Sequence, residues 1–216
     1  MKTNALLCTA LAAVSLGACV ETRFESPPGD NIETCDARWK GLWLGDDEKP
    51  KDSNTAIFVD EGCRFTVLDQ PERGGPFKEV HVAVNFVHTD GKDYLVVADA
   101  ALKGLVKVNP VYGIEPMPER SFFIDRYVVR GDHIDLFAVD DQLAARKVIE
   151  GKLEGSVSKT PSELHVFIRG DRARVLQILR RDTIFNAKPQ LRLGKVKQSV
   201  AEFEQAAIAA QKKAKP

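Results

Sequence analysis

The sequence is poor in the features that mark membrane-spanning, metal-binding and catalytic proteins. Beyond its first 18 residues, no stretch approaches the roughly 20 apolar residues that a membrane-crossing helix requires. It has four cysteines and four histidines, and none of them is spaced like the ligands of a metal site. A Gly-x-Ser-x-Gly nucleophile turn and a glycine-rich phosphate loop are both lacking. We therefore expect no cofactor, no metal and no catalysis. One alternative stays open: a glycosidase-like pair of carboxylates far apart in the sequence.

The first residues of the chain have the layout of an export signal. A basic start, Met1-Lys2, precedes an apolar run from Ala5 to Leu16 that is too short to span a bilayer and ends in small residues. The four residues Leu16-Gly17-Ala18-Cys19 resemble the lipobox of bacterial lipoproteins. The resemblance implies that residues 1–18 are a cleaved signal peptide. It also implies that Cys19 becomes the first residue and carries diacylglycerol and palmitate.

Such a lipid anchor would place the protein in the bacterial envelope. Two or more acyl chains hold a protein stably at a bilayer, so a lipidated Cys19 keeps the domain at a membrane surface. Val20 follows the cysteine at the position where, in enteric lipoproteins, an aspartate causes retention in the inner membrane. We therefore expect the outer membrane, with the domain facing the periplasm. The inner membrane and the cell surface are the alternatives, and nucleic acid is not an expected partner.

The remaining 198 residues suit one domain with extensions. Residues 19–34 contain Pro27-Pro28-Gly29 and no periodic apolar pattern, which predicts a flexible tether. Residues 35–197 are predicted to form a β-rich globular domain, and residues 198–216 an amphipathic helix with a basic tail. Cys8 leaves with the signal peptide and Cys19 carries lipid. Cys35 and Cys63 remain, and in an oxidising compartment they are predicted to form a disulfide.

Apolar periodicity predicts an α+β fold in which strand hairpins come first and helices come late. Alternating apolar residues indicate strands at 38–44, 55–60, 63–68, 80–88, 94–98, 121–129, 133–139, 152–158 and 163–168. Asp140 or Asp141 is expected to cap a helix at 142–150, and Asp171 a helix that ends near 181. Ser199 and Glu202 form a capping box for a last helix to about 211. The expected architecture is an antiparallel sheet or open barrel with helices added in the C-terminal third.

Two tryptophans mark the first predicted strand. Trp39 and Trp43 lie four residues apart and are expected to share its buried face. Gly41-Leu42-Trp43 also resembles the Gly-x-Trp pattern of the first lipocalin strand, and Thr89-Asp90 with Tyr94 resembles the second motif of that family. This resemblance implies a barrel that binds an apolar ligand. The alternative interpretation is a pair of core tryptophans beside a close-packed glycine.

The charge of the chain is neutral in sum but unevenly distributed. Residues 19–168 carry 18 Lys or Arg against 27 Asp or Glu, whereas residues 169–216 carry 12 against 4. Four arginines of the helix after Asp171 lie off its apolar stripe, and such a cluster favours encounter with an anionic partner; they are Arg172, Arg174, Arg180 and Arg181. Arg174 and Arg181, seven residues apart, are expected to share a partner-binding face. The competing interpretation is that the arginines pair with the acidic part of the same domain.

Together these features predict a lipid-anchored envelope protein whose function is binding rather than catalysis. The expected partner is another envelope protein or an anionic envelope polymer. One alternative is an immunity or inhibitor lipoprotein that neutralises a toxin or lytic enzyme in the periplasm, because small lipoproteins with one disulfide and no motif resemble such inhibitors too. Another is a lipocalin-like binder of an apolar ligand.

Overall fold

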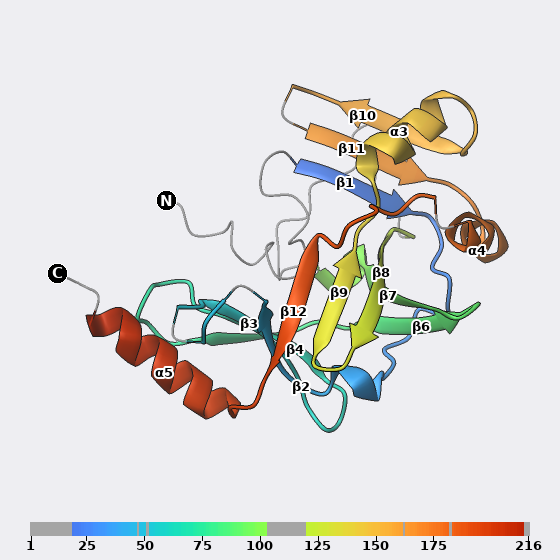
Figure 1. The fold of residues 1–216 in the computed structure, drawn as a ribbon. Coiled ribbons are helices and arrows are strands. Elements are labelled where there is room, and N and C mark those ends of the chain that lie inside the picture. Colours follow the sequence, from blue (N-terminus) through green and yellow to red (C-terminus); the bar gives the residue numbers. More distant parts are fainter. Residues whose placement is uncertain are drawn as a thin grey trace.

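The computed structural model describes residues 19–46, 48–50, 52–102, 120–161, 163–181 and 183–213 (Figure 1). The predicted signal peptide and the end of the basic tail lie outside these ranges. Within them the fold is α+β, as predicted, with one open and mostly antiparallel twelve-stranded sheet. Four α-helices accompany the described part of the sheet, three of them in the C-terminal half. No helix among the described residues is long and apolar enough to cross a membrane.

The described elements follow one another closely along the chain. The strands are β1 (Cys19–Phe24), β2 (Gly41–Gly45), β3 (Thr55–Val59), β4 (Phe65–Asp69), β5 (Lys78–His81), β6 (Asn85–Thr89), β7 (Lys92–Ala98), β8 (Phe122–Arg130), β9 (His133–Phe137), β10 (Gly155–Lys159), β11 (Glu163–Ile168) and β12 (Leu191–Val196). The helices are α2 (Asp99–Leu102), α3 (Asp141–Ile149), α4 (Arg172–Arg180) and α5 (Val200–Lys213), and a 3-10 turn, η1 (Ala37–Trp39), precedes β2.

The sheet branches at β8. Its main path has the order β10-β11-β1-β8-β9-β12-β2-β3-β4-β5, and β7, which carries β6, pairs with the other edge of β8. β9 pairs with residues Arg126–Arg130, whereas β1 meets the same edge of β8 only at Phe122. β1 and β9 therefore diverge, and β10, β11 and β1 form a wing beside the larger sheet (Figure 1). Because the path ends at β10 and β5, the closed barrel implied by the resemblance to lipocalins is not formed.

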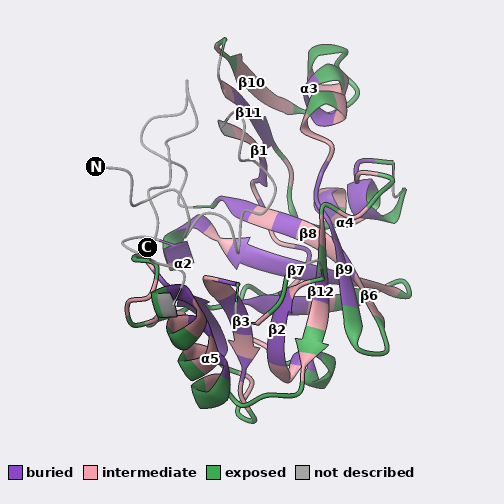
Figure 2. Cartoon of the chain, turned by 60° about the vertical axis from the view of Figure 1, so that its left-hand side comes forward, coloured by how far each residue is buried: buried purple, intermediate pink, exposed green. Residues whose placement is uncertain are grey.

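Helix α3 packs against the strands of the wing, and α4 lies beyond the arrowhead of β1 (Figure 1). Val175 and Leu179 of α4 and Ala144 of α3 are buried in one cluster with Phe24 and Ile168 of the strands. Burial of each large apolar side chain contributes about 1.5–3 kcal/mol, so this cluster holds the wing and the two helices together. Figure 2 shows buried residues along the strands and on the inner sides of these helices.

A second cluster fills the larger sheet around Trp39. Its ring centroid lies 5.4 Å from that of Tyr127, 5.5 Å from that of Phe86 and 5.8 Å from that of Phe65. Helix α5 closes a third cluster, in which Phe203 is fully buried. The C-terminal helix is thus packed against the sheet.

The predicted helix caps are confirmed. Asp140 and Asp171 each accept a hydrogen bond, at 2.9 Å, from the backbone N–H three residues further along the chain. At α5, the Ser199 backbone N–H donates to Glu202 at 2.8 Å, and the Glu202 N–H donates to the Ser199 hydroxyl at 3.3 Å. Each cap satisfies an N–H that the first turn of a helix leaves without a partner.

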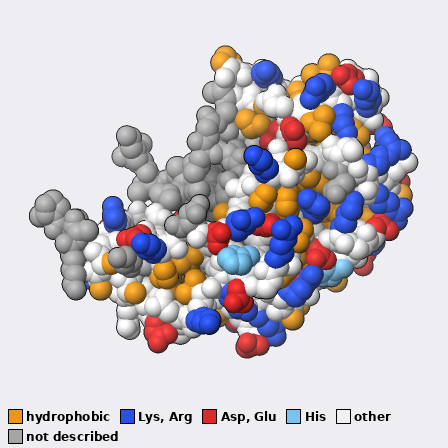
Figure 3. All heavy atoms as spheres, viewed as in Figure 1, with side chains coloured by type: hydrophobic (Ala, Val, Ile, Leu, Met, Phe, Trp, Pro, Cys, Tyr) orange, Lys and Arg blue, Asp and Glu red, His pale blue; other side chains and the backbone are white. Residues whose placement is uncertain are grey.

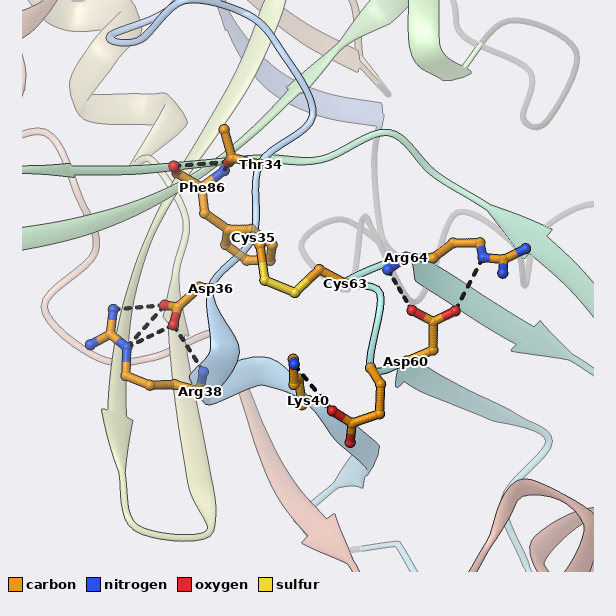
Figure 4. Close-up of a disulfide and its surroundings, with 10 residues drawn as sticks. Thr34, Cys35, Asp36, Arg38, Lys40, Asp60, Cys63, Arg64 and Phe86 are labelled. Carbon is orange, nitrogen blue, oxygen red and sulfur yellow. Dashed lines mark hydrogen bonds and ion pairs between the residues drawn. A yellow bond between two sulfur atoms is a disulfide. The ribbon is translucent and has the colours of Figure 1, made fainter.

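The predicted disulfide between Cys35 and Cys63 is present, with Cα atoms 5.3 Å apart. It joins the segment before η1 to the turn between β3 and β4 (Figure 4). Asp60 and Arg64 form an ion pair at 3.2 Å beside it, and Arg38 pairs with Asp36 at 2.7 Å on the other side. The disulfide therefore fixes the chain at the start of the Trp39 cluster.

The prediction of a tether at residues 19–34 is wrong for its first six residues, because they form β1. This strand pairs in parallel with β11 along its whole length, from Cys19 opposite Glu163 to Phe24 opposite Ile168. Its pattern is short and interrupted by charges, and Arg23 is nevertheless fully buried. The partners that permit this burial lie far away in the sequence, so the local pattern gave no sign of a strand.

Several predicted strands have other ends in the structure, such as 152–158, which is β10 at Gly155–Lys159, and two predictions differ in more than their ends. Trp39 lies in η1 rather than on a strand with Trp43, although the Trp43 indole N–H donates to the Trp39 carbonyl at 2.6 Å and both rings share one cluster. The strand predicted at 80–88 is divided into β5 and β6 around Val82 and Val84, which are buried as the chain passes between the two strands. The apolar alternation in the sequence thus predicts which side chains are buried. It does not predict that the whole stretch pairs as one strand.

Candidate anion-binding site

A cavity of about 280 Å³ lies between α3 and α4. Its apolar residues are Leu153, Ile178 and Ile184, which are 8%, 7% and 1% exposed. All three belong to the cluster that packs α3 and α4 against the wing. The base of the cavity is therefore part of the core and holds its shape without a ligand.

Four cationic side chains line this apolar base. Lys147 and Lys152 come from the last turn of α3 and the segment after it, and Arg174 and Arg181 come from α4 and its C-cap. No Asp or Glu is among the described residues that line the cavity. Figure 3 shows Lys and Arg side chains gathered on the molecular surface over α3 and α4. The site thus combines a preformed apolar base with a strongly positive rim.

Among the described residues, the hydrogen bonds of the rim leave most of its cations without a carboxylate partner. Lys147 Nζ donates to the Thr183 hydroxyl at 2.9 Å, and Arg174 Nη1 donates to the side-chain carbonyl of Gln177. Both acceptors are neutral. Lys152, in contrast, pairs with a carboxylate of Glu150 at 2.7 Å. In the described part of the chain, three of the four cations therefore lack a carboxylate partner.

Helix electrostatics explain some of these cations but not all of them. Lys147 in the last turn of α3 and Arg181 at the C-cap of α4 each face the negative end of a helix dipole, which is worth about 0.3–1 kcal/mol per cation. Arg174 is the third residue of α4, where the dipole is positive and a cation is unfavourable. Arg174 therefore gives its own helix no electrostatic benefit, and its position is consistent with an external anion.

The structure separates the four arginines predicted to bind a partner. Arg172 Nη1 pairs with Asp30 at 2.5 Å, and Arg180 Nε pairs with Asp90 at 2.6 Å. The hydrogen bond from Arg180 lowers the pKa of Asp90. Arg174 and Arg181 instead share the cavity. Arg172 and Arg180 thus pair within the domain, as the competing interpretation expects. For Arg174 and Arg181, a role in partner binding stays a prediction.

Sequence reasoning missed the two lysines of the site. Lys147 and Lys152 lie more than 20 residues before Arg174. Lys147 belongs to α3 and Lys152 to the segment after it, and the pattern of neither gives a reason to associate it with α4. They reach the cavity because α3 and α4 pack on the same cluster. A basic residue in the last turn of a helix is common, so the sequence contained no signal that distinguished Lys147.

The predicted lipidation residue begins the wing. The backbone of Cys19 is the first position of β1 and is paired with Glu163 of β11, while its side chain lies outside the description. Lipidation of Cys19 stays a prediction.

A second polar cluster lies beside β1. Arg23 Nη2 contacts Glu21 at 2.6 Å, and Arg23 Nε lies 3.5 Å from Asp99, whose pKa burial raises. His165 Nδ1 lies 2.8 Å from the same Glu21. The guanidinium also lies 5.1 Å from the ring centroid of Phe123. Because the charges compensate one another and the cluster is largely buried, we assign it to the stability of the wing.

The histidines do not come together. Each lies beside a different carboxylate: His81 near Glu33, His88 near Asp93, His133 near Asp46 and His165 near Glu21. Within the residues that the structure describes, no group of three or more His, Cys, Asp or Glu side chains is arranged to hold a metal ion.

Comparison of this chain with models of protein families, with curated proteins and with solved structures finds no match.

Proposed function

We propose that the protein is a lipid-anchored, non-catalytic envelope protein that binds an anionic partner in the cavity between α3 and α4. The observation that carries the proposal is the set of Lys147, Arg174 and Arg181 around an apolar base, without carboxylate partners among the described residues. Anchoring through Cys19 rests on the lipobox resemblance of residues 16–19.

The donors of the cavity suit carboxylate and phosphate groups. Arginine offers a planar fork of N–H donors that fits two oxygens of such a group at once, and lysine adds a compact charge. Arg174 is half-buried where it lines the cavity, whereas Arg181 is exposed. Such an arrangement holds a charged group in the rim and lets an apolar part of the same ligand contact Ile178 and Leu153.

The anchoring part of the proposal is tested by labelling cells with radioactive palmitate. The wild type incorporates the label and is recovered with membranes, whereas the Cys19→Ser variant is unlabelled and soluble. An unlabelled, soluble wild type would contradict it.

The binding part is tested by recovery of ligand from envelope extracts with immobilised Cys19→Ser chain. Charge reversal of Arg174 and Arg181 together removes the recovered material, and added salt weakens recovery by the unaltered chain because the contact is ionic. Equal recovery by both chains would contradict a role for the cavity.

A further inference from the structure

The first strand connects the predicted anchor directly to the helices that form the cavity. Cys19 occupies the first position of β1, and Phe24 the last, five residue steps away. At about 3.3 Å per residue the strand covers roughly 17 Å. Beyond Phe24 the chain contacts the start of α4. The N–H of Gly170, just before the cap residue of α4, donates to Glu25 at 2.8 Å, and Arg172, the first residue of α4, donates to the Pro28 carbonyl at 3.1 Å.

Helix α3 runs in the same direction as β1. Its first residue, Asp141, accepts a hydrogen bond from Thr22 near the middle of β1. After its last turn, Glu154 accepts a hydrogen bond from the backbone N–H of Arg169, which follows the final residue of β11. Both walls of the cavity thus lie toward the Phe24 end of the wing, and in Figure 1 the arrow of β1 points toward α4.

The order of β1 limits how the domain can turn on its anchor. A flexible tether of residues 19–34 would span about 20 Å and would let any face of the domain reach the bilayer. Instead, the backbone is hydrogen-bonded into the sheet from Cys19 onward, so the lipid would be attached at a fixed corner of the wing. Lys159, the last residue of β10, lies at the same corner. It pairs with Leu164, the residue after Glu163, and Glu163 is the residue opposite Cys19.

We propose that the cavity faces away from the anchoring bilayer and binds the carboxylate or phosphate groups of an envelope polymer rather than the headgroups of the lipids that hold Cys19. This inference rests on the proposed function and adds the orientation and the class of ligand. The cavity has room for one compact charged group that protrudes from its ligand. A polymer presents such a group in each of its repeating units. A folded protein partner would need a broad surface of about 800 Å² on each side.

The orientation is tested by energy transfer in vesicles. The lipidated full chain carries a fluorophore at Gln177→Cys, beside the cavity, or at Lys159→Cys, beside the anchor, and the vesicles contain a headgroup-labelled acceptor lipid. Transfer from position 177 is weaker than from position 159. Equal or stronger transfer from position 177 would overturn the proposal. Thr183→Cys repeats the measurement at another wall of the cavity, in case the Gln177 variant is unstable.

The class of ligand is tested with the same anchored chain and two soluble polymers, polyphosphate and polyglutamate. Binding of at least one persists on vesicles of neutral lipid and is about tenfold weaker when Arg174 and Arg181 are both glutamate. The matched control reverses Arg73 and Lys197, two exposed cations away from the cavity.

The two proposals fail in different ways. If neither polymer binds to the anchored or the soluble chain, the anion-binding function fails whatever the energy transfer shows. If polymer binds but position 177 lies as close to the lipid as position 159, only the orientation fails, and the cavity then lies near the lipid headgroups.

Discussion

Thr22 donates its hydroxyl hydrogen to Asp141 Oδ1 at 2.6 Å, so the middle of β1 is hydrogen-bonded to the first turn of α3. This contact lies near the point at which β1 and β9 diverge from β8, and Asp125 of β8 lies there too. Burial raises the pKa of Asp141 to about 6, and burial together with the nearby Asp141 raises that of Asp125 to about 7. Glu21 and Asp140 add negative charge around Asp141. The branch of the sheet thus holds two carboxyl groups that take up protons at a higher pH than they would in the unfolded chain.

These carboxyl groups make stability depend on pH. Their folded pKa values lie above the unfolded value of about 3.9, so the folded protein binds more protons than the unfolded chain. Their stabilising contribution is complete below about pH 4 and is lost as the pH rises through 6 to 7. We expect the melting temperature to fall between pH 5 and pH 8.

The variant Asp125→Asn isolates this effect, because the amide stays neutral at every pH. It is expected to melt at a higher temperature than the wild type at pH 8 and to show a smaller change between pH 5 and pH 8. An exposed control, Asp52→Asn, keeps the slope of the wild type. Parallel curves for wild type and Asp125→Asn would show that Asp125 is ionised in the folded protein.

Burial of Arg23 predicts a large loss of stability on substitution. The variant Arg23→Met removes the cation that compensates Glu21 and Asp99, and breaking a buried pair in this way costs about 3–5 kcal/mol. The variant Arg64→Met removes an exposed ion pair to Asp60 and is expected to cost less than about 1 kcal/mol. Denaturant unfolding compares the two. A change at Arg23 no larger than that at Arg64 would mean that residues 19–24 behave as a tether.

The disulfide predicts a second loss of stability. Replacement of both Cys35 and Cys63 by serine frees a segment with a sequence separation of 28. The greater chain entropy of the unfolded state is expected to lower the free energy of unfolding by about 3–4 kcal/mol. The unfolding midpoint of the double variant, compared with that of the wild type before and after reduction, measures this contribution. If reduction leaves the wild type unchanged, the bond contributes little.

The ion pair between Arg172 and Asp30 predicts compensation on charge exchange. Arg172→Asp or Asp30→Arg alone is expected to cost about 0.2–1 kcal/mol, because both side chains are exposed. The double exchange restores the pair and part of the loss. None of these variants is expected to change anion binding, because neither residue lines the cavity. Additive losses in a thermal double-mutant cycle would show that the pair contributes no stability.

The sequence predicted elements that are specified locally and missed those that depend on distant partners. The helix caps at Asp140, Asp171 and Ser199 were identified because a cap needs only the residues of its own first turn. The hairpin of β3 and β4 was identified because both strands alternate beside a two-residue turn. β12 was missed because its residues, LRLGKV, bury little of their own surface, and the strand exists through its pairing with β9 and β2.

The candidate site shows the same limit. Arg174 and Arg181 could be placed on one face because their spacing is a property of a single helix. The ion pairs of Arg172 and Arg180 join α4 to Asp30 and Asp90, more than 80 residues earlier, and helix spacing contains no information about such contacts. The contribution of Lys147 likewise requires the packing of α3 beside α4.

Calorimetric titration of the soluble Cys19→Ser chain with polyphosphate measures whether the cavity binds an anion. We expect saturable binding that weakens with salt and falls about tenfold or more when Arg174 and Arg181 are both glutamate. We also expect this variant to keep its free energy of unfolding within about 1 kcal/mol of the unaltered chain and reversal of Arg73 and Lys197 to leave binding unchanged. Unchanged binding in the Arg174 and Arg181 variant, together with a clear loss of stability, would show that these arginines serve the fold and that the cavity is not an anion-binding site.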